Sequence, residues 1–103
     1  MFPAAGVGVS VSAHWALPFI APFLPNILYD GTIPALMVGS MNIPHPPPEE
    51  PLDFPRPDVI KLGVPTVLLN GVIFCPIQFS TAWHVGGAPT FVATGIPTIL
   101  IGA

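Results

Sequence analysis

The chain has 103 residues, 51% of them hydrophobic and 7% charged, with a net charge of −3 at pH 7. We expect one domain, residues 1–103. Its core is small, so a cross-link such as a disulfide or a structural metal ion, here called a staple, would help to stabilise it. Its single cysteine excludes an internal disulfide, and its two basic residues exclude the cationic surface that nucleic-acid binding needs.

The charges are unevenly distributed. All of them lie between Asp30 and Lys61, so residues 62–103 carry none. Prolines interrupt every apolar stretch before it is long enough for a membrane-spanning helix. The first residues lack a basic stretch followed by an unbroken apolar run, so no Sec signal peptide is expected. An apolar surface with so little charge predicts either cover by a partner or contact with lipid.

Taken in chain order, three similar runs each lead to a histidine. The first goes from Pro3-Ala4 to His14, and the second goes from Pro34-Ala35 to His45 with the same spacing. The third, one residue shorter, goes from Phe74 to His84 and contains Cys75. The chain has three histidines in total, and they occupy near-equivalent places in the three runs.

Strand-like phrases lie between these runs. Residues 63–69 read Gly-Val-Pro-Thr-Val-Leu-Leu and residues 95–101 read Gly-Ile-Pro-Thr-Ile-Leu-Ile, with a weaker copy at residues 25–31. Each copy places large apolar residues after a proline, as expected for a short strand. Asp30-Gly31 and Asn70-Gly71 are dipeptides that favour hairpin turns. Three copies predict three arms related by an approximate threefold axis.

Equivalent positions in three such arms converge at the axis. We therefore expect His14, His45 and His84 to meet, with the Cys75 thiolate completing the tetrahedral site that structural Zn²⁺ favours. Each histidine taken alone is better explained as a satisfied polar residue. Cys75 aligns with Ala4 and Ala35, so a small buried hydrophobic residue is its alternative role.

The remaining segments complete a mainly β prediction. The Pro-rich, acidic residues 44–58 are interpreted as an extended loop, as a linker insertion in preference to a docking motif. With 16 prolines and 10 glycines, the chain leaves room for no helix beyond one helical turn around residues 77–84.

The repeated phrases at residues 63–71 and 95–102, with Pro3-Ala4-Ala5 and Pro34-Ala35, resemble the PAAR-repeat family over nearly the whole chain. The resemblance implies a short β-rich cone, stapled near its point by zinc on three histidines and one cysteine. Such proteins form the tip of contractile injection machines, including type VI secretion systems and phage tails.

The function that this resemblance implies is structural, not enzymatic. The chain would cap a trimeric spike protein, VgrG-like or phage tail-spike-like, and sharpen it for transient contact with a target membrane. It would assemble in the bacterial cytoplasm and leave on contraction. Whether effectors bind the tip stays open. The chain departs from the family's motif, because Gly6, Met37 and Ile77 stand where the arginine is expected.

Two other functions stay open. One is a membrane-active small effector or a zinc-binding protein with no spike partner. The other is a zinc enzyme, which the four expected protein ligands disfavour because they leave no open position for water.

Overall fold

The computed structural model describes residues 2–13, 16–45, 55–85 and 89–101. Within these ranges lie nine strands: β1 (Phe2–Ala4), β2 (Phe19–Tyr29), β3 (Ile33–Asn42), β4 (Asp58–Ile60), β5 (Val64–Leu69), β6 (Ile73–Cys75), β7 (Thr81–His84), β8 (Pro89–Phe91) and β9 (Ile96–Ile101). No helix occurs among the described residues, which confirms the mainly β prediction. The Pro-rich segment lies mostly outside the described residues.

The helical turn expected around residues 77–84 is wrong. Ile77–Ser80 is a turn of another kind, and Thr81–His84 is strand β7. This strand pairs with β4 on one side and with β8 on the other, and that pairing overrides the weak local preference for a helix.

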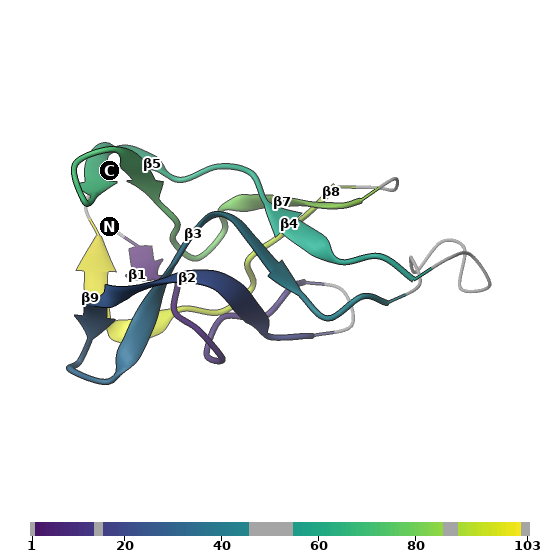
Figure 1. Cartoon of the computed structure of the whole chain (residues 1–103), viewed down its shortest axis with the longest axis horizontal. Helices are drawn as coiled ribbons and strands as arrows, with labels where there is room; N and C mark the ends of the chain where they lie inside the picture. The colour runs from purple at the N-terminus through teal and green to yellow at the C-terminus, as the bar shows by residue number, and fades with distance from the viewer. Residues whose placement is uncertain (1, 14–15, 46–54, 86–88, 102–103) are drawn as a thin grey trace.

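Three antiparallel strand pairs lie at one end of the molecule: β1–β9, β5–β6 and the turn end of β2–β3 (Figure 1). The three pairs share one register irregularity. Two consecutive residues on one strand pair with residues that are four positions apart on the other strand, so the second strand bulges between them. The paired steps are Pro3↔Leu100 and Ala4↔Ile96, Pro34↔Leu28 and Ala35↔Leu24, and Phe74↔Leu68 and Cys75↔Val64. The repeated phrases therefore form strands with the same bulged pairing.

Two of these pairs are closed by the predicted hairpin turns. Asp30 and Asn70 have φ values of 52° and 53°, and the glycines that follow them have φ values of 75° and 77°. Asp and Asn tolerate this left-handed conformation better than most side chains, and glycine adopts it freely. The β1–β9 pair has no turn, because the two ends of the chain lie there (Figure 1).

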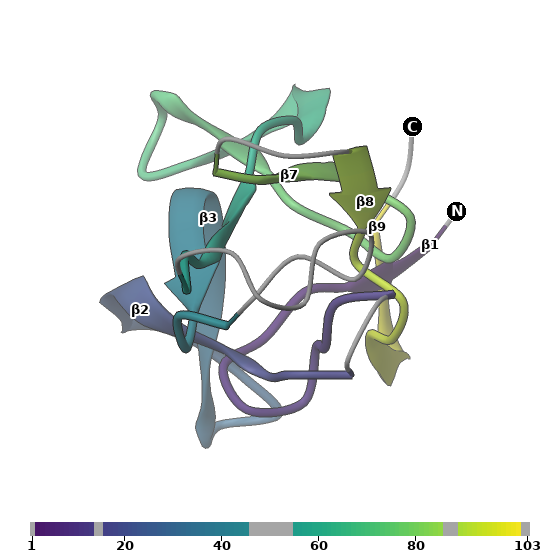
Figure 2. The same cartoon turned by 90° about the vertical axis from the view of Figure 1, so that its right-hand side faces the viewer.

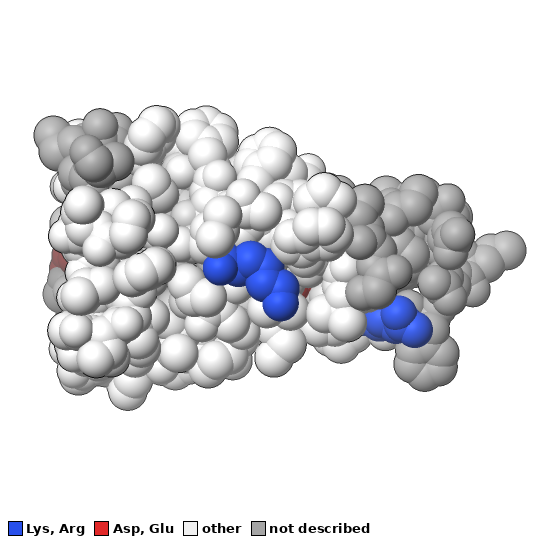
Figure 3. All heavy atoms as spheres, turned by 90° about the horizontal axis from the view of Figure 1, so that it is seen from above, with Lys and Arg blue, Asp and Glu red and all other residues white. Residues whose placement is uncertain are grey.

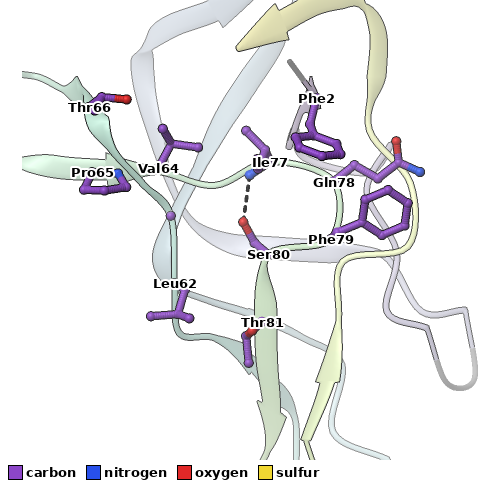
Figure 4. A pocket seen from close by; sticks show the side chains of 11 residues that line it. Phe2, Leu62, Val64, Pro65, Thr66, Ile77, Gln78, Phe79, Ser80 and Thr81 are labelled. Atoms are coloured by element: carbon purple, nitrogen blue, oxygen red, sulfur yellow. Dashed lines mark hydrogen bonds between the residues drawn. The ribbon is translucent and has the colours of Figure 1, made fainter. Parts of the chain in front are cut away.

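A buried serine lies inside each of the three runs that lead to a histidine. Ser10, Ser40 and Ser80 each accept a hydrogen bond on Oγ from a backbone N–H three or four residues earlier, at 2.9–3.0 Å. Figure 4 shows one of these bonds, from the Ile77 N–H to Ser80. All three serines are buried, and each bond satisfies a backbone donor within its own run.

The core has two clusters. The first lies among the three strand pairs and consists of Ala4, Tyr29, Ala35, Leu69, Cys75 and Ile96. The second consists of Ala5, Phe19, Leu36, Ile60, Ala82 and Val92. A five-stranded sheet in the order β2-β3-β4-β7-β8 runs along the molecule and packs on the second cluster. Figure 2 looks along the long axis and shows the β2–β3 and β1–β9 pairs on opposite sides.

The surface carries little charge. In Figure 3 the two basic side chains of the protein are separate blue patches, and most of the described surface around them is white. Many large apolar side chains are exposed, including Val72, Phe79 and Leu62. None of the described residues belongs to a helix that is long and apolar enough to cross a membrane.

Candidate metal centre

Three adjacent strands bring a polar cluster together inside the five-stranded sheet. Asp58 is the first residue of β4, and its register partner on β7 is His84. His45 follows β3. Its backbone N–H donates to the Arg56 carbonyl oxygen at 3.0 Å, and the Arg56 N–H donates to the His45 carbonyl oxygen at 2.9 Å. Since β4 lies between β3 and β7, Asp58 lies between the two histidines.

The three side chains are buried and in contact. His45, Asp58 and His84 are 6%, 0% and 1% exposed. His45 Nε2 lies 3.3 Å from Asp58 Oδ2, and His84 Nδ1 lies 3.2 Å from Asp58 Oδ1. The two imidazole rings are 4.7 Å apart. One ligand atom from each residue can be chosen so that all three lie within 4.8 Å of one another, close enough to hold one metal ion.

Asn42 fixes the carboxylate of Asp58 in this cluster. Its Nδ2 donates to Asp58 Oδ2 at 2.8 Å, and its Oδ1 accepts from the Asp58 backbone N–H at 2.7 Å. Asn42 is itself buried. A buried carboxylate is costly unless it is hydrogen-bonded and its charge is balanced. Asn42 supplies two hydrogen bonds to Asp58, and a metal ion bound at this cluster would balance the charge of the carboxylate.

The structure brings together two of the four residues that the sequence predicts as zinc ligands. His45 and His84 meet as expected. His14 lies outside the described residues. Cys75 is in the first core cluster, with the strand pairs, and the His45–Asp58–His84 group does not include it.

Cys75 is instead paired with Tyr29. Its Sγ lies 3.4 Å from the Tyr29 hydroxyl, and both side chains are buried. Burial raises the pKa of the Cys75 thiol, and the bond to Tyr29 offsets part of that rise. Burial, and then the bond to Cys75, raise the pKa of Tyr29. Both groups are therefore neutral near pH 7, and they form a hydrogen-bonded pair inside the first core cluster.

The sequence alone does not predict that Asp58 and Asn42 belong to this cluster. The extended Pro-rich loop expected at residues 44–58 ends at Asp58. One signal was available: the apolar residues Val59 and Ile60 follow it, which is typical of a buried strand start. Nothing in the local sequence marks Asn42, because its role depends on the β3–β4 pairing.

A second concave feature is a pocket of about 360 Å³ between the start of β5 and the Ile77–Ser80 turn (Figure 4). Phe2 and Phe79 form part of its wall, with ring centroids 5.8 Å apart. None of the side chains that line this pocket is ionisable, so the pocket offers an apolar surface with no acid or base.

Comparison of the sequence with models of known protein families and with curated proteins finds no match.

Proposed function

We propose that this chain is a structural tip that caps the trimeric β-helical spike of a contractile injection machine, as the PAAR-like sequence features imply. The observation that carries the proposal is the register shared by the three strand pairs at one end. Three equivalent pairs fit a three-chain partner, because each pair can continue the β-structure of one subunit by main-chain pairing.

Packing at this end supports the proposal. Ala4, Ala35 and Cys75 occupy the same position in the three registers, and each has an exposed fraction of 0%. They also belong to one core cluster. Three equivalent small side chains that pack into one cluster are what an approximate threefold axis would produce.

The strand pairs are also joined to one another through polar side chains. Thr98 on β9 donates to Asp30 in the β2–β3 turn at 2.5 Å. Asn26 on β2 donates to Asn70 in the β5–β6 turn at 2.8 Å. In the aligned phrases, Asn26 and Thr98 follow equivalent prolines. The same kind of bond thus connects neighbouring pairs and favours a rigid base for a partner.

A zinc ion is the proposed staple of the part of the molecule where β3, β4 and β7 lie side by side. The buried His45–Asp58–His84 cluster supports it, because imidazole nitrogen and carboxylate oxygen are zinc ligands. A structural zinc contributes roughly 10–16 kcal/mol of apparent binding free energy in small zinc domains. Such a contribution suits a domain that has no disulfide and must survive thrust.

The exposed apolar side chains favour a second candidate function, a membrane-active protein without a spike partner. Exposed apolar residues also suit a tip that passes through a bilayer, so they do not separate the two functions. Leakage of dye-filled liposomes caused by the chain alone would support the second candidate.

The first proposal is tested by binding to purified trimeric β-helical spike proteins. Three leucines at equivalent register positions, Leu28, Leu68 and Leu100, are 48%, 45% and 51% exposed. We expect one chain per spike trimer by light scattering, and loss of the complex when all three leucines become aspartate. The matched control is Leu62→Asp, an exposed leucine outside the strand pairs. A ratio of three chains per trimer, or equal effects of the two variants, would contradict the proposal.

A further inference from the structure

The ligand set that the family resemblance implies does not fit this chain in one respect. Cys75 is bonded to Tyr29 in the first core cluster, while Asp58 is in contact with both described histidines. We infer that Asp58, positioned by Asn42, is a direct ligand in an all nitrogen-and-oxygen metal site, and that the Cys75 thiol is a core residue.

The hydrogen bonding of His45 directs a lone pair toward Asp58. Nδ1 of His45 lies 2.7 Å from the carbonyl oxygen of Ile43, which can only accept, so Nδ1 carries a proton. In the neutral ring, Nε2 then has no proton and faces Asp58 Oδ2 at 3.3 Å. Two acceptors at this distance repel unless a cation lies between them. A metal ion bound by both atoms would remove this repulsion.

The same bond to Ile43 favours the metal ion. Histidines that bind metals commonly donate the other ring N–H to a backbone carbonyl or a carboxylate, which fixes the ring. His45 has this arrangement through Ile43, and the Nδ1 of His84 lies 3.2 Å from Asp58 Oδ1. Both rings are thus oriented as metal-binding histidines are.

The spacing of the atoms also agrees with a metal. Zinc bonds of about 2.0–2.2 Å at tetrahedral angles place two ligand atoms about 3.3–3.5 Å apart. The separation of 3.3 Å between His45 Nε2 and Asp58 Oδ2 falls in this range. The cluster therefore needs little rearrangement to accept an ion at that contact.

Asn42 determines how Asp58 can act. Its two hydrogen bonds, to the carboxylate and from the backbone of the same residue, hold the carboxylate in one orientation. An imidazole and carboxylate set suits zinc, cobalt(II) and nickel(II), whereas a thiolate favours softer ions such as copper(I). Asn42 is thus a positioning residue for Asp58. The ligand set itself favours metal ions of intermediate softness, such as zinc, over soft ions.

Cobalt(II) is the probe that tests this inference, because a thiolate ligand gives an intense charge-transfer absorption in the near ultraviolet and nitrogen or oxygen ligands do not. The full chain is stripped of metal and loaded with cobalt(II), and zinc affinity is measured by calorimetry. We expect one ion per chain, no thiolate band, and an affinity that changes less than about threefold in Cys75→Ala. A thiolate band that Cys75→Ala removes would overturn the inference.

Variants at position 58 separate a direct ligand from a supporting residue. We expect Asp58→Asn to lose more than the roughly 10–100-fold in affinity that a residue behind the ligands typically controls, and Asn42→Ala to fall within that range. Asp58→Cys should bind cobalt(II) with a new thiolate band. This gain of signal reports contact with the ion even if Asp58→Asn folds poorly. Metal binding by Asp58→Cys without the band would refute the assignment of Asp58 as a ligand.

The inference rests on the proposed function only for the presence of a structural metal. Spike binding is read from the leucine variants, and the ligand set is read from cobalt spectra of the free chain. If the chain binds the spike but shows a thiolate band, the inferred ligand set is wrong and the proposed function stands. If the chain shows the expected spectra but forms no spike complex, the proposed function is wrong and the inferred ligand set stands.

Discussion

Gly63 and Gly95 begin the two repeated strand phrases, and each allows close contact with the backbone of a neighbouring segment. Replacing either glycine should therefore destabilise the fold. A Cβ atom at Gly63 would lie 2.7 Å from both the carbonyl carbon and the oxygen of Phe74, and 2.9 Å from the carbonyl carbon of Cys75. Ordinary contact begins at 3.4 Å, so β5 and β6 would have to separate by 3.4 − 2.7 = 0.7 Å. Overpacking typically costs about 1–3 kcal/mol, and one weakened backbone hydrogen bond about 1 kcal/mol more. Gly63→Ala should therefore lower the free energy of unfolding by about 2–4 kcal/mol.

The assay is urea unfolding followed by tryptophan fluorescence, once with saturating zinc and once with a chelator. Gly71→Ala is the matched control: Gly71 has a φ of +77°, and no atom lies within 4 Å of the added Cβ. This control should cost only the strain of a left-handed alanine, about 1–2 kcal/mol. Gly95→Ala should resemble Gly63→Ala, since its Cβ would lie 2.7 Å from Pro3 Cβ and 3.0 Å from the Ala4 oxygen. A smaller loss for Gly63→Ala than for Gly71→Ala would refute the reasoning.

Three further predictions concern buried polar groups. Ser40→Ala should lower the free energy of unfolding by about 2–4 kcal/mol in urea titrations, because the Met37 N–H and the Pro22 carbonyl lose the Ser40 hydroxyl that bonds both; a change below about 0.5 kcal/mol would contradict this. Cys75 should resist Ellman's reagent at pH 8 in the folded protein and react at once in urea, because burial hides the thiol and raises its pKa; rapid reaction without urea would refute it. Stability should fall as pH rises above the ordinary pKa values of 9.0 for Cys75 and 10.0 for Tyr29, because the unfolded chain then loses protons that the folded chain keeps. The slope should reach at most about 1.4 kcal/mol per pH unit for each group, and it should flatten in Tyr29→Phe.

The parts of the fold that the sequence predicts correctly are set by neighbouring residues. Apolar residues after a proline became strands, and Asp30-Gly31 and Asn70-Gly71 became left-handed turns. The sequence predicts less well which strands pair with one another. The β1–β9 pair joins the two ends of the chain, and no turn in the sequence announces it. The expected helical turn failed for the same reason, since β7 takes its conformation from β4 and β8.

The candidate site shows the same limit. The repeat identified His45 and His84, because their equivalent spacing survives in the sequence. Asp58 lies outside the repeated runs, and only the order β3-β4-β7 places it between the histidines. The repeat also predicts the role of Cys75 better than its assignment as a zinc ligand does. Its alignment with Ala4 and Ala35 predicts a small core residue, which is the environment that the structure gives it.

The two ends of the molecule are held together by different physical effects. Among the strand pairs, the first core cluster is small and apolar apart from the Tyr29–Cys75 pair, so its stability comes from close packing of repeated positions. Around β4, stability depends on charge, because Asp58 is the one buried carboxylate among the described residues. Replacing a buried ion cluster by apolar residues is often neutral or stabilising. A cluster of buried His45, Asp58 and His84 is thus poorly explained by folding stability alone, and a bound cation gives a physical reason for all three to be there.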